Sequence, residues 1–208
     1  MNLPDTLPQR LYLLAYDPDK GRTRTGSLGE LVRAAALTDL YLNGHLADER
    51  GRPVVEVRHP CHDPVLEALL AEVAEARRPR KWKAWIGRRG KPAHRAVREQ
   101  LAEGGWVRVE TGRVLLFFPR TKVTLRDPRV RKHLASRVSR ALSDPVGRVD
   151  PADAALVALS AAAELKHVLD RRRRRDNKAR IADLTRLAGP AAPALRQVIS
   201  EQASSAAG

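Results

Sequence analysis

The chain has 208 residues, 43% of them hydrophobic, which is enough for a folded core and excludes a wholly disordered protein. Its 39 lysines and arginines exceed its 24 acidic residues, and the formal net charge of +15 favours a polyanionic partner: nucleic acid, an anionic membrane or an acidic protein. A single cysteine excludes a disulfide framework, and no window reaches the roughly 18 apolar residues of a spanning helix. We therefore expect a cytoplasmic chain without a signal peptide, which would lie on a membrane rather than in it.

A central buried helix is predicted between residues 28 and 42. Apolar side chains recur there at helical spacing and on nearly all sides, and Asn43-Gly44 supplies a stop signal. Two charged residues, Arg33 and Asp39, interrupt the apolar pattern. A charge on a buried helix needs a partner, so they are expected either to pair with each other or another acid, or to face an opening to water.

Shorter elements follow this helix. The stretch HLADERGRPVVEV predicts a hairpin about Gly51, and Asp63 before a proline is a typical start for the next helix. Residues 77–92 are basic and broken by Gly and Pro, which indicates a loop around a short helical piece. Residues 93–103 then predict a helix with Arg95 and Arg98 on one face.

The second half begins with a predicted hairpin, GGWVRVETGRVLLFFP, whose two β-rich runs flank Thr111-Gly112. Four large apolar residues of the second run cannot all enter the core: Leu115, Leu116, Phe117 and Phe118. The outward-facing ones must meet a lipid, another subunit or a neighbouring loop, and the basic residues around them favour an anionic bilayer.

The remainder predicts helices, including one from Lys178 to Leu187, and a disordered tail at 201–208. The run Arg171–Arg175 is expected at the end of a long helix that begins near Pro151, where positive charge complements the helix dipole. We interpret it as a solvated helix end whose main contribution is long-range attraction to an anionic surface.

No catalytic motif is present: the sequence has no GxSxG, P-loop, HExxH or paired CxxC. His59, Cys61 and His62 are of metal-ligand type, but they lack a further ligand and predict a surface turn. The sequence thus predicts no enzyme, no metal and no cofactor. An alternative is a winged-helix nucleic-acid binder, with Arg95 and Arg98 toward phosphates and the VETGRV turn as the wing.

Five stretches stand out in order: LYLLAYDPDKG, RAAALTDLYLNGHL, the pair Trp85-Ile86, HRAVREQLAEGGWV and VLLFF. In this order they resemble the Golgi phosphoprotein 3 family, which has bacterial relatives and whose eukaryotic members are peripheral membrane proteins that recognise phosphatidylinositol 4-phosphate. The resemblance implies a mainly α fold: one helical domain over residues 1–200, with amphipathic helices around a central buried helix and short antiparallel β-hairpins, one of them protruding.

The resemblance also implies binding residues. The family's headgroup arginines fall on Arg33, Arg95 and Arg98, and a guanidinium gains charge-assisted bonds from a phosphate. The family's neighbouring tryptophan is absent from GRTRTGSLGELV, where Arg22 or Arg24 would replace it as a phosphate donor. Residues 115–118 would contact the membrane or a second copy in a homo-oligomer.

The expected function is therefore non-catalytic binding of anionic phospholipid at the inner face of the membrane. Acidic protein tails are possible further partners, because the family gathers cargo at membranes, and nucleic acid is the less favoured one.

Overall fold

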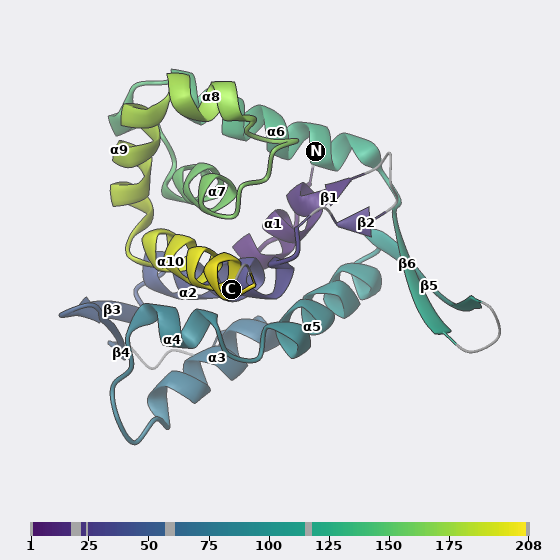
Figure 1. Ribbon diagram of the computed structural model, residues 1–208, viewed down its shortest axis with the longest axis horizontal. Helices are drawn as coiled ribbons and strands as arrows, with labels where there is room; N and C mark the ends of the chain where they lie inside the picture. Colours follow the sequence, from purple (N-terminus) through teal and green to yellow (C-terminus); the bar gives the residue numbers. More distant parts are fainter. Residues whose placement is uncertain (1, 18–21, 24, 57–60, 115–117, 207–208) are drawn as a thin grey trace.

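The computed structural model describes residues 2–17, 22–23, 25–56, 61–114 and 118–206. Within them the chain is mainly helical, as predicted, and the helices surround α2 (Figure 1). The helices are α1 (Leu7–Ala15), α2 (Leu28–Leu42), α3 (Pro64–Ala74), α4 (Trp82–Ile86), α5 (Gly90–Glu103), α6 (Pro128–Ser143), α7 (Pro151–Ala162), α8 (Arg171–Asp176), α9 (Lys178–Ala188) and α10 (Ala191–Ser205). The strands are β1 (Tyr16–Asp17), β2 (Arg22–Thr23), β3 (Leu46–Glu49), β4 (Arg52–Val55), β5 (Val107–Val114) and β6 (Phe118–Leu125).

Helix α2 is the centre of the fold. Its residues from Leu28 to Leu40 are buried apart from Glu30, and it packs against α1, α3, α4, α5, α7 and α10. Alanines at positions 34–36 let these neighbours approach closely, because a small side chain keeps helix axes near each other. The predicted central helix is confirmed.

Helices α2 and α5 cross at a contact between two glycines. A Cβ built on Gly29 would lie 2.6 Å from the Gly90 carbonyl carbon, closer than real Cβ contacts come, and one on Gly90 would lie 3.2 Å from Gly29. Backbone therefore packs directly on backbone at the start of both helices. This contact fixes α5, and with it Arg95 and Arg98, against the core.

The buried Asp39 caps α1 from another helix. Its Oδ2 accepts a hydrogen bond from the Leu7 amide at 2.7 Å, whereas Thr6, the residue before α1, makes no side-chain cap bond. Its Oδ1 accepts from the Asn43 side chain at 2.7 Å. Burial raises the pKa of Asp39, and the bond from Leu7 acts against that shift. Asp39 therefore satisfies one backbone donor at the start of α1 and does not pair with Arg33.

The described strands form three antiparallel pairs, β1–β2, β3–β4 and β5–β6. The β5–β6 pair protrudes from the helical body (Figure 1). Its predicted turn at Thr111-Gly112 is wrong: β5 continues through both residues, Thr111 pairs with Thr121, and Val114 pairs with Phe118. The prediction of strands before and after Thr111-Gly112 was correct. A Thr-Gly pair can itself lie within a strand when the partner strand is long enough to pair with it.

The base of this hairpin is anchored to the body. Val107 and Val123 are buried, and the hydroxyl of Tyr16 donates a hydrogen bond to the Val123 carbonyl oxygen at 2.9 Å. Arg108 and Lys122 belong to the opposite face of the pair and are exposed. The strands thus alternate between an apolar inner face and a charged outer face, on which Glu110 stands opposite Lys122.

The run Arg171–Arg175 begins a short helix and does not end a long one. Helix α7 stops at Ala162, and Asp170 caps α8 by accepting from the Arg173 amide at 2.8 Å. Arg173 also donates to the Val168 carbonyl oxygen and, at 3.0 Å, to the Ser139 hydroxyl of α6. Asp170 is an N-cap, so a new helix begins after it. The apolar pattern before Asp170 had predicted one continuous helix.

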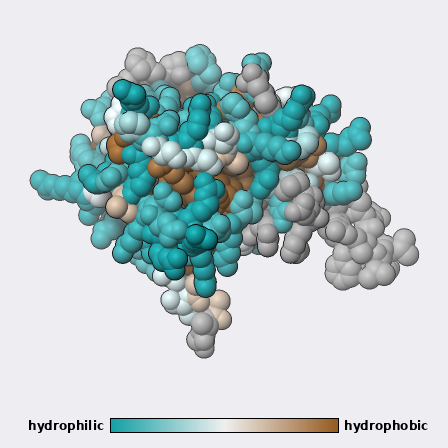
Figure 2. All heavy atoms as spheres, turned by 90° about the horizontal axis from the view of Figure 1, so that it is seen from above, coloured by the Kyte–Doolittle hydropathy of each residue, from teal (hydrophilic) through white to brown (hydrophobic). Residues whose placement is uncertain are grey.

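Helical structure extends further along the described part of the chain than the sequence predicted. Helix α10 continues to Ser205, past the expected start of a disordered tail at residue 201, and it buries Leu195 and Val198. On the face shown in Figure 2, hydrophilic side chains cover most of the surface, and hydrophobic ones appear only in small areas between them. Within the described ranges, no helix combines the length and apolar character needed to cross a membrane.

Candidate functional site

Arg33 projects from α2 into a buried ion pair. Its Nη1 and Nη2 donate to the two carboxylate oxygens of Glu72 on α3, at 3.3 and 3.1 Å, and its Nε donates to the Trp85 carbonyl oxygen at 3.0 Å. The Arg33 side chain is 5% exposed and that of Glu72 25%. The guanidinium charge is thus matched within the protein, by an acid other than the Asp39 considered from the sequence.

This pair lies in the α3–α5 cleft, a cavity of about 420 Å³ between α2, α3 and α5. Small and apolar side chains form most of its walls, and charged ones stand at its ends. The lining residues are Val32, Arg33, Ala36, Pro64, Val65, Ala68, Leu69, Glu72, Arg89, Pro92, Ala93, Ala96, Glu99, Gln100 and Glu103. Neither Arg95 nor Arg98 belongs to this lining, so the cleft does not unite the three predicted arginines.

Arg95 and Arg98 belong instead to what we call the α5 basic stripe, Lys91, Arg95 and Arg98, which recur at positions i, i+4 and i+7 of one helix face. The Arg95 side chain is 71% exposed and pairs with Glu99 at 2.9 Å. Arg98 is half-buried, and its Nε is buried with no hydrogen-bond partner among the described residues. Ala96 lines the same cleft as Arg33, and residues 96 and 98 point about 200° apart around a helix. Arg33 and Arg98 therefore lie on different sides of α5.

The charge of Arg98 affects the pKa values of two ionisable groups, Tyr12 and His94. Burial raises the pKa of Tyr12 to about 12, and the positive charge of Arg98 acts against that shift. Burial also lowers the pKa of His94; a hydrogen bond with the Gly90 carbonyl oxygen raises it, and Arg98 lowers it further. Arg98 is therefore close to α1, in a partly desolvated place where a charge interacts strongly.

Most of the other predicted site residues lie outside the described ranges. Arg24 and Leu115, Leu116 and Phe117 lie outside the described residues. Phe118 is the first residue of β6, at the far end of the hairpin from its anchored base. The VETGRV stretch expected as a winged-helix turn is paired strand, so the wing of the nucleic-acid alternative is absent there.

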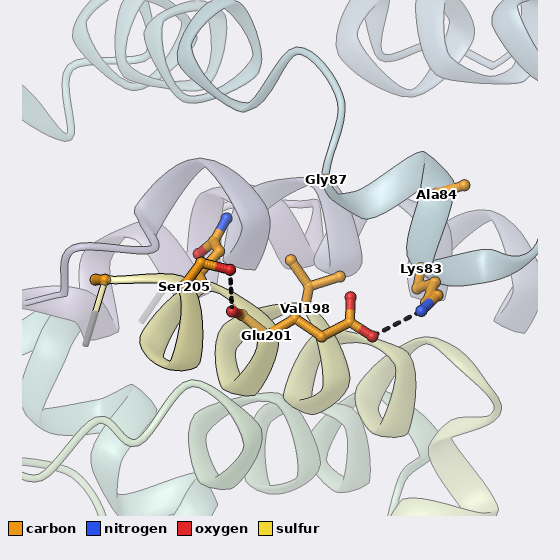
Figure 3. Close-up of a pocket in the computed structure, with 8 residues that line it drawn as sticks. Lys83, Ala84, Gly87, Val198, Glu201 and Ser205 are labelled. Carbon is orange, nitrogen blue, oxygen red and sulfur yellow. Dashed lines mark hydrogen bonds and ion pairs between the residues drawn. The ribbon is translucent and has the colours of Figure 1, made fainter. Parts of the chain in front are cut away.

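A second hollow of about 520 Å³ lies between α4 and α10 (Figure 3). Lys83 reaches across it to Glu201, with 2.6 Å between Nζ and Oε1, and Val198 forms part of its floor. The two charges at this hollow neutralise each other and tie α10 to α4. We therefore interpret it as a helix contact.

A helix cap, Asp63, follows the predicted surface turn at His59, Cys61 and His62. The Asp63 side chain accepts from the amides of Val65 and Leu66, which starts α3 as predicted. Cys61 is buried, and burial together with nearby carboxylates raises the pKa of its thiol. His59 lies outside the described residues. The described part of the chain holds no group of three or more His, Cys, Asp or Glu side chains placed to bind a metal ion.

Sequence reasoning missed Lys91 and Glu72. The sequence predicted a helix from residue 93, whereas α5 begins at Gly90. A predicted helix that began three residues earlier would have placed Lys91, Arg95 and Arg98 on one face. Glu72 gave no local signal. Its partner is 39 positions away in the sequence, and only the packing of α3 on α2 brings them together.

Comparison with known proteins identifies the family. The protein-family model described as Golgi phosphoprotein 3 (GPP34) matches residues 7–202. A search of curated proteins returned no match. The matched span begins at α1, reaches into α10 and includes α2, α5 and the β5–β6 hairpin. Because this span is nearly the whole sequence, the chain belongs to the Golgi phosphoprotein 3 family.

Proposed function

We propose that this chain is a non-catalytic peripheral membrane protein that binds anionic phospholipid headgroups at the cytoplasmic face of a membrane. Family membership and the net charge of +15 support this function. The observation that carries it is the α5 basic stripe. Arg98 is half-buried and has no acid partner among the described residues, and a phosphate would supply the opposite charge to its guanidinium.

The stripe has accessible neighbours for a first encounter. Lys91 is exposed. Among the described residues Arg95 forms an ion pair only with Glu99, a surface pair that contributes little and can be exchanged for a phosphate. The exposed Arg108 adds positive charge on the hairpin, where the charge of Lys122 is offset by Glu110 opposite it. Each basic residue near an anionic surface contributes about 1 kcal/mol, so a few suffice to hold the protein there.

The proposal gives Arg33 an indirect role. Its ion pair with Glu72 fixes α2 against α3, and α5 packs on α2, so Arg33 positions the stripe without touching a headgroup. The hairpin residues 115–118 remain the proposed membrane or subunit contact. Serine at Leu116 and Phe117 should then reduce vesicle binding or the oligomeric mass measured by light scattering. Unchanged values in both assays would remove this part of the proposal.

Flotation with vesicles tests the function. We expect binding to phosphatidylcholine vesicles that contain phosphatidylglycerol or phosphatidylinositol 4-phosphate, and none to phosphatidylcholine alone. Glutamine at Lys91, Arg95 or Arg98 should each weaken binding roughly fivefold, from the loss of about 1 kcal/mol. Arg89→Gln and Arg172→Gln remove the same charge elsewhere and serve as controls. Equal losses in the controls would reject the stripe, and no binding to either acidic vesicle would reject the function.

A further inference from the structure

The α3–α5 cleft is an apolar groove with room for a small molecule. Its volume of about 420 Å³ falls in the range of roughly 300 to 1,000 Å³ seen for ligand sites. The space exists because the facing side chains are short: Ala36 on α2, Ala68 on α3, and Ala93 and Ala96 on α5. Ala68 is exposed, and Ala93 and Ala96 are half-buried, so part of this apolar wall meets water. An apolar chain laid along the wall would release that water.

Two contacts between α3 and α5 define the direction of the cleft. Glu72, late in α3, lies 3.6 Å from Nη1 of Arg89, which precedes α5. Asp63, which precedes α3, accepts a hydrogen bond at 3.0 Å from Gln100, late in α5. The two helices therefore run antiparallel along the cleft. From Arg89 to Gln100 the lining follows α5 for about three turns, or about 16 Å. At about 1.2 Å per bond, an extended chain of about ten carbons with its head group fits this length.

The Arg89 end of the cleft has a positive charge to offer. Both carboxylate oxygens of Glu72 already accept hydrogen bonds from Arg33. The 3.6 Å between Arg89 and the same carboxylate is too long for a hydrogen bond, and the Arg89 side chain is 66% exposed. Its guanidinium therefore keeps donors that an incoming anion can reach. Two guanidiniums and one carboxylate give this end a net charge of +1.

The opposite end of the cleft is negative. Glu103, one helical turn past Gln100, lines the cleft and is exposed. It forms no ion pair within the described part of the chain. Glu99 also lines the cleft, but its charge is matched by Arg95 at 2.9 Å. An anionic head group is thus favoured beside Arg89 and disfavoured beside Glu103, which orients a ligand that has one charged end.

We propose that the α3–α5 cleft binds a medium-chain fatty acid. The Arg89 guanidinium donates charge-assisted hydrogen bonds to the ligand carboxylate, and the alkyl chain lies along the alanine-lined walls toward the Glu103 end. The net charge of +15 attracts such an anion at long range. This site is separate from the α5 basic stripe, because neither Arg95 nor Arg98 lines the cleft.

Calorimetric titration of the whole chain with monomeric n-octanoate, without vesicles, tests the proposal separately from the flotation assay. We expect binding with a Kd below about 1 mM. n-Octanol lacks the charge and should bind at least roughly fivefold more weakly. Octanedioate must place its second carboxylate among the apolar walls or near Glu103, and should bind at least roughly tenfold more weakly. Decanoate, with two more buried methylenes, should bind about tenfold more tightly than octanoate. No binding of octanoate, or equally tight binding of octanol or octanedioate, overturns the proposal.

Paired variants locate the site. Arg89→Gln should weaken octanoate binding at least roughly fivefold, whereas Arg88→Gln removes the same charge at an exposed position outside the lining and should leave it unchanged. Ala68→Leu fills the cleft from α3 and should abolish binding, whereas Ala71→Leu, exposed on α3 outside the lining, should not. Both alanines are exposed, so neither leucine should disturb folding. Equal affinities in the two glutamine variants, or wild-type affinity in Ala68→Leu, also overturn the proposal.

Discussion

Arg33 and Glu72 form a two-bond ion pair, at 3.1 and 3.3 Å, between the central helix α2 and helix α3. Glu72→Ala would leave the buried guanidinium without its acid. We expect it to lower the free energy of unfolding by about 2 kcal/mol, less than the roughly 3 to 5 kcal/mol of a fully buried pair, because the Glu72 side chain is 25% exposed. Urea denaturation measures this loss.

Arg89→Ala is the matched control for that variant. Arg89 pairs with the same carboxylate at 3.6 Å, but its side chain is 66% exposed, so its loss should cost less than about 0.5 kcal/mol. The same proteins test the role of Arg33. If Arg33 bound a headgroup, its release from Glu72 would raise the affinity for acidic vesicles more than Glu75→Ala does, which removes the same charge at an exposed position; we expect equal affinities.

The glycine contact between α2 and α5 gives a second prediction. Gly29→Ala should destabilise the protein by about 2 kcal/mol, even though alanine favours a helix, because its Cβ would lie 2.6 Å from Gly90 backbone. Gly90→Ala, with 3.2 Å to Gly29, should cost less. Gly26→Ala meets no atom within 4 Å and should be neutral. Equal melting temperatures for Gly29→Ala and Gly26→Ala would contradict the close crossing.

The pKa of Tyr12 tests whether Arg98 lies beside α1. Arg98→Gln removes a positive charge that stabilises the tyrosinate, so the pKa of Tyr12 should rise further above its value of about 12. The measurement is the absorbance of tyrosinate against pH, with Tyr12→Phe to assign the transition. Arg95→Gln is the control, since Arg95 is exposed and its charge is not among the causes of the Tyr12 shift. A pKa that is the same in both glutamine variants would place Arg98 elsewhere.

Alkaline stability should depend on the same tyrosine. The folded-state pKa is raised from 10 to about 12, so the folded chain keeps a proton that the unfolded chain loses. The contribution of Tyr12 to stability is therefore full below pH 10 and is lost as the pH rises through about 12. Relative to Tyr12→Phe, wild type should lose at most about 3 kcal/mol across this window in urea denaturation. A constant difference between the two proteins would disprove the shift.

The arginine run offers a further pair of variants. Arg173 donates to the Val168 carbonyl oxygen and to the Ser139 hydroxyl, so Arg173→Ala should cost about 1.5 kcal/mol by detaching α8 from α6. The neighbouring Arg172 is 85% exposed, and its loss should stay within about 0.5 kcal/mol. Thermal unfolding of the two alanine variants distinguishes them. Similar melting temperatures would support the interpretation of the whole run as solvated.

Much of the helical framework was predictable because its signals are local. Asp63 before a proline starts α3, Asn43-Gly44 ends α2, and the apolar spacing of residues 28–42 required burial on nearly all sides. The wrong predictions fell where two local signals competed. Thr111-Gly112 resembled a turn but pairs as strand, and Asp170 capped a new helix where the apolar pattern indicated continuation.

The sequence by itself determined the family, the helical class and the need for partners at Arg33 and Asp39, because propensity, periodicity and the cost of a buried charge act on nearby residues or on composition. Only the tertiary structure decided who those partners are. Glu72 and the Leu7 amide meet α2 through helix packing across 39 and 32 sequence positions, a distance at which no local pattern carries information. The same packing put Arg33 in the α3–α5 cleft and Arg98 beside α1, on different sides of one helix.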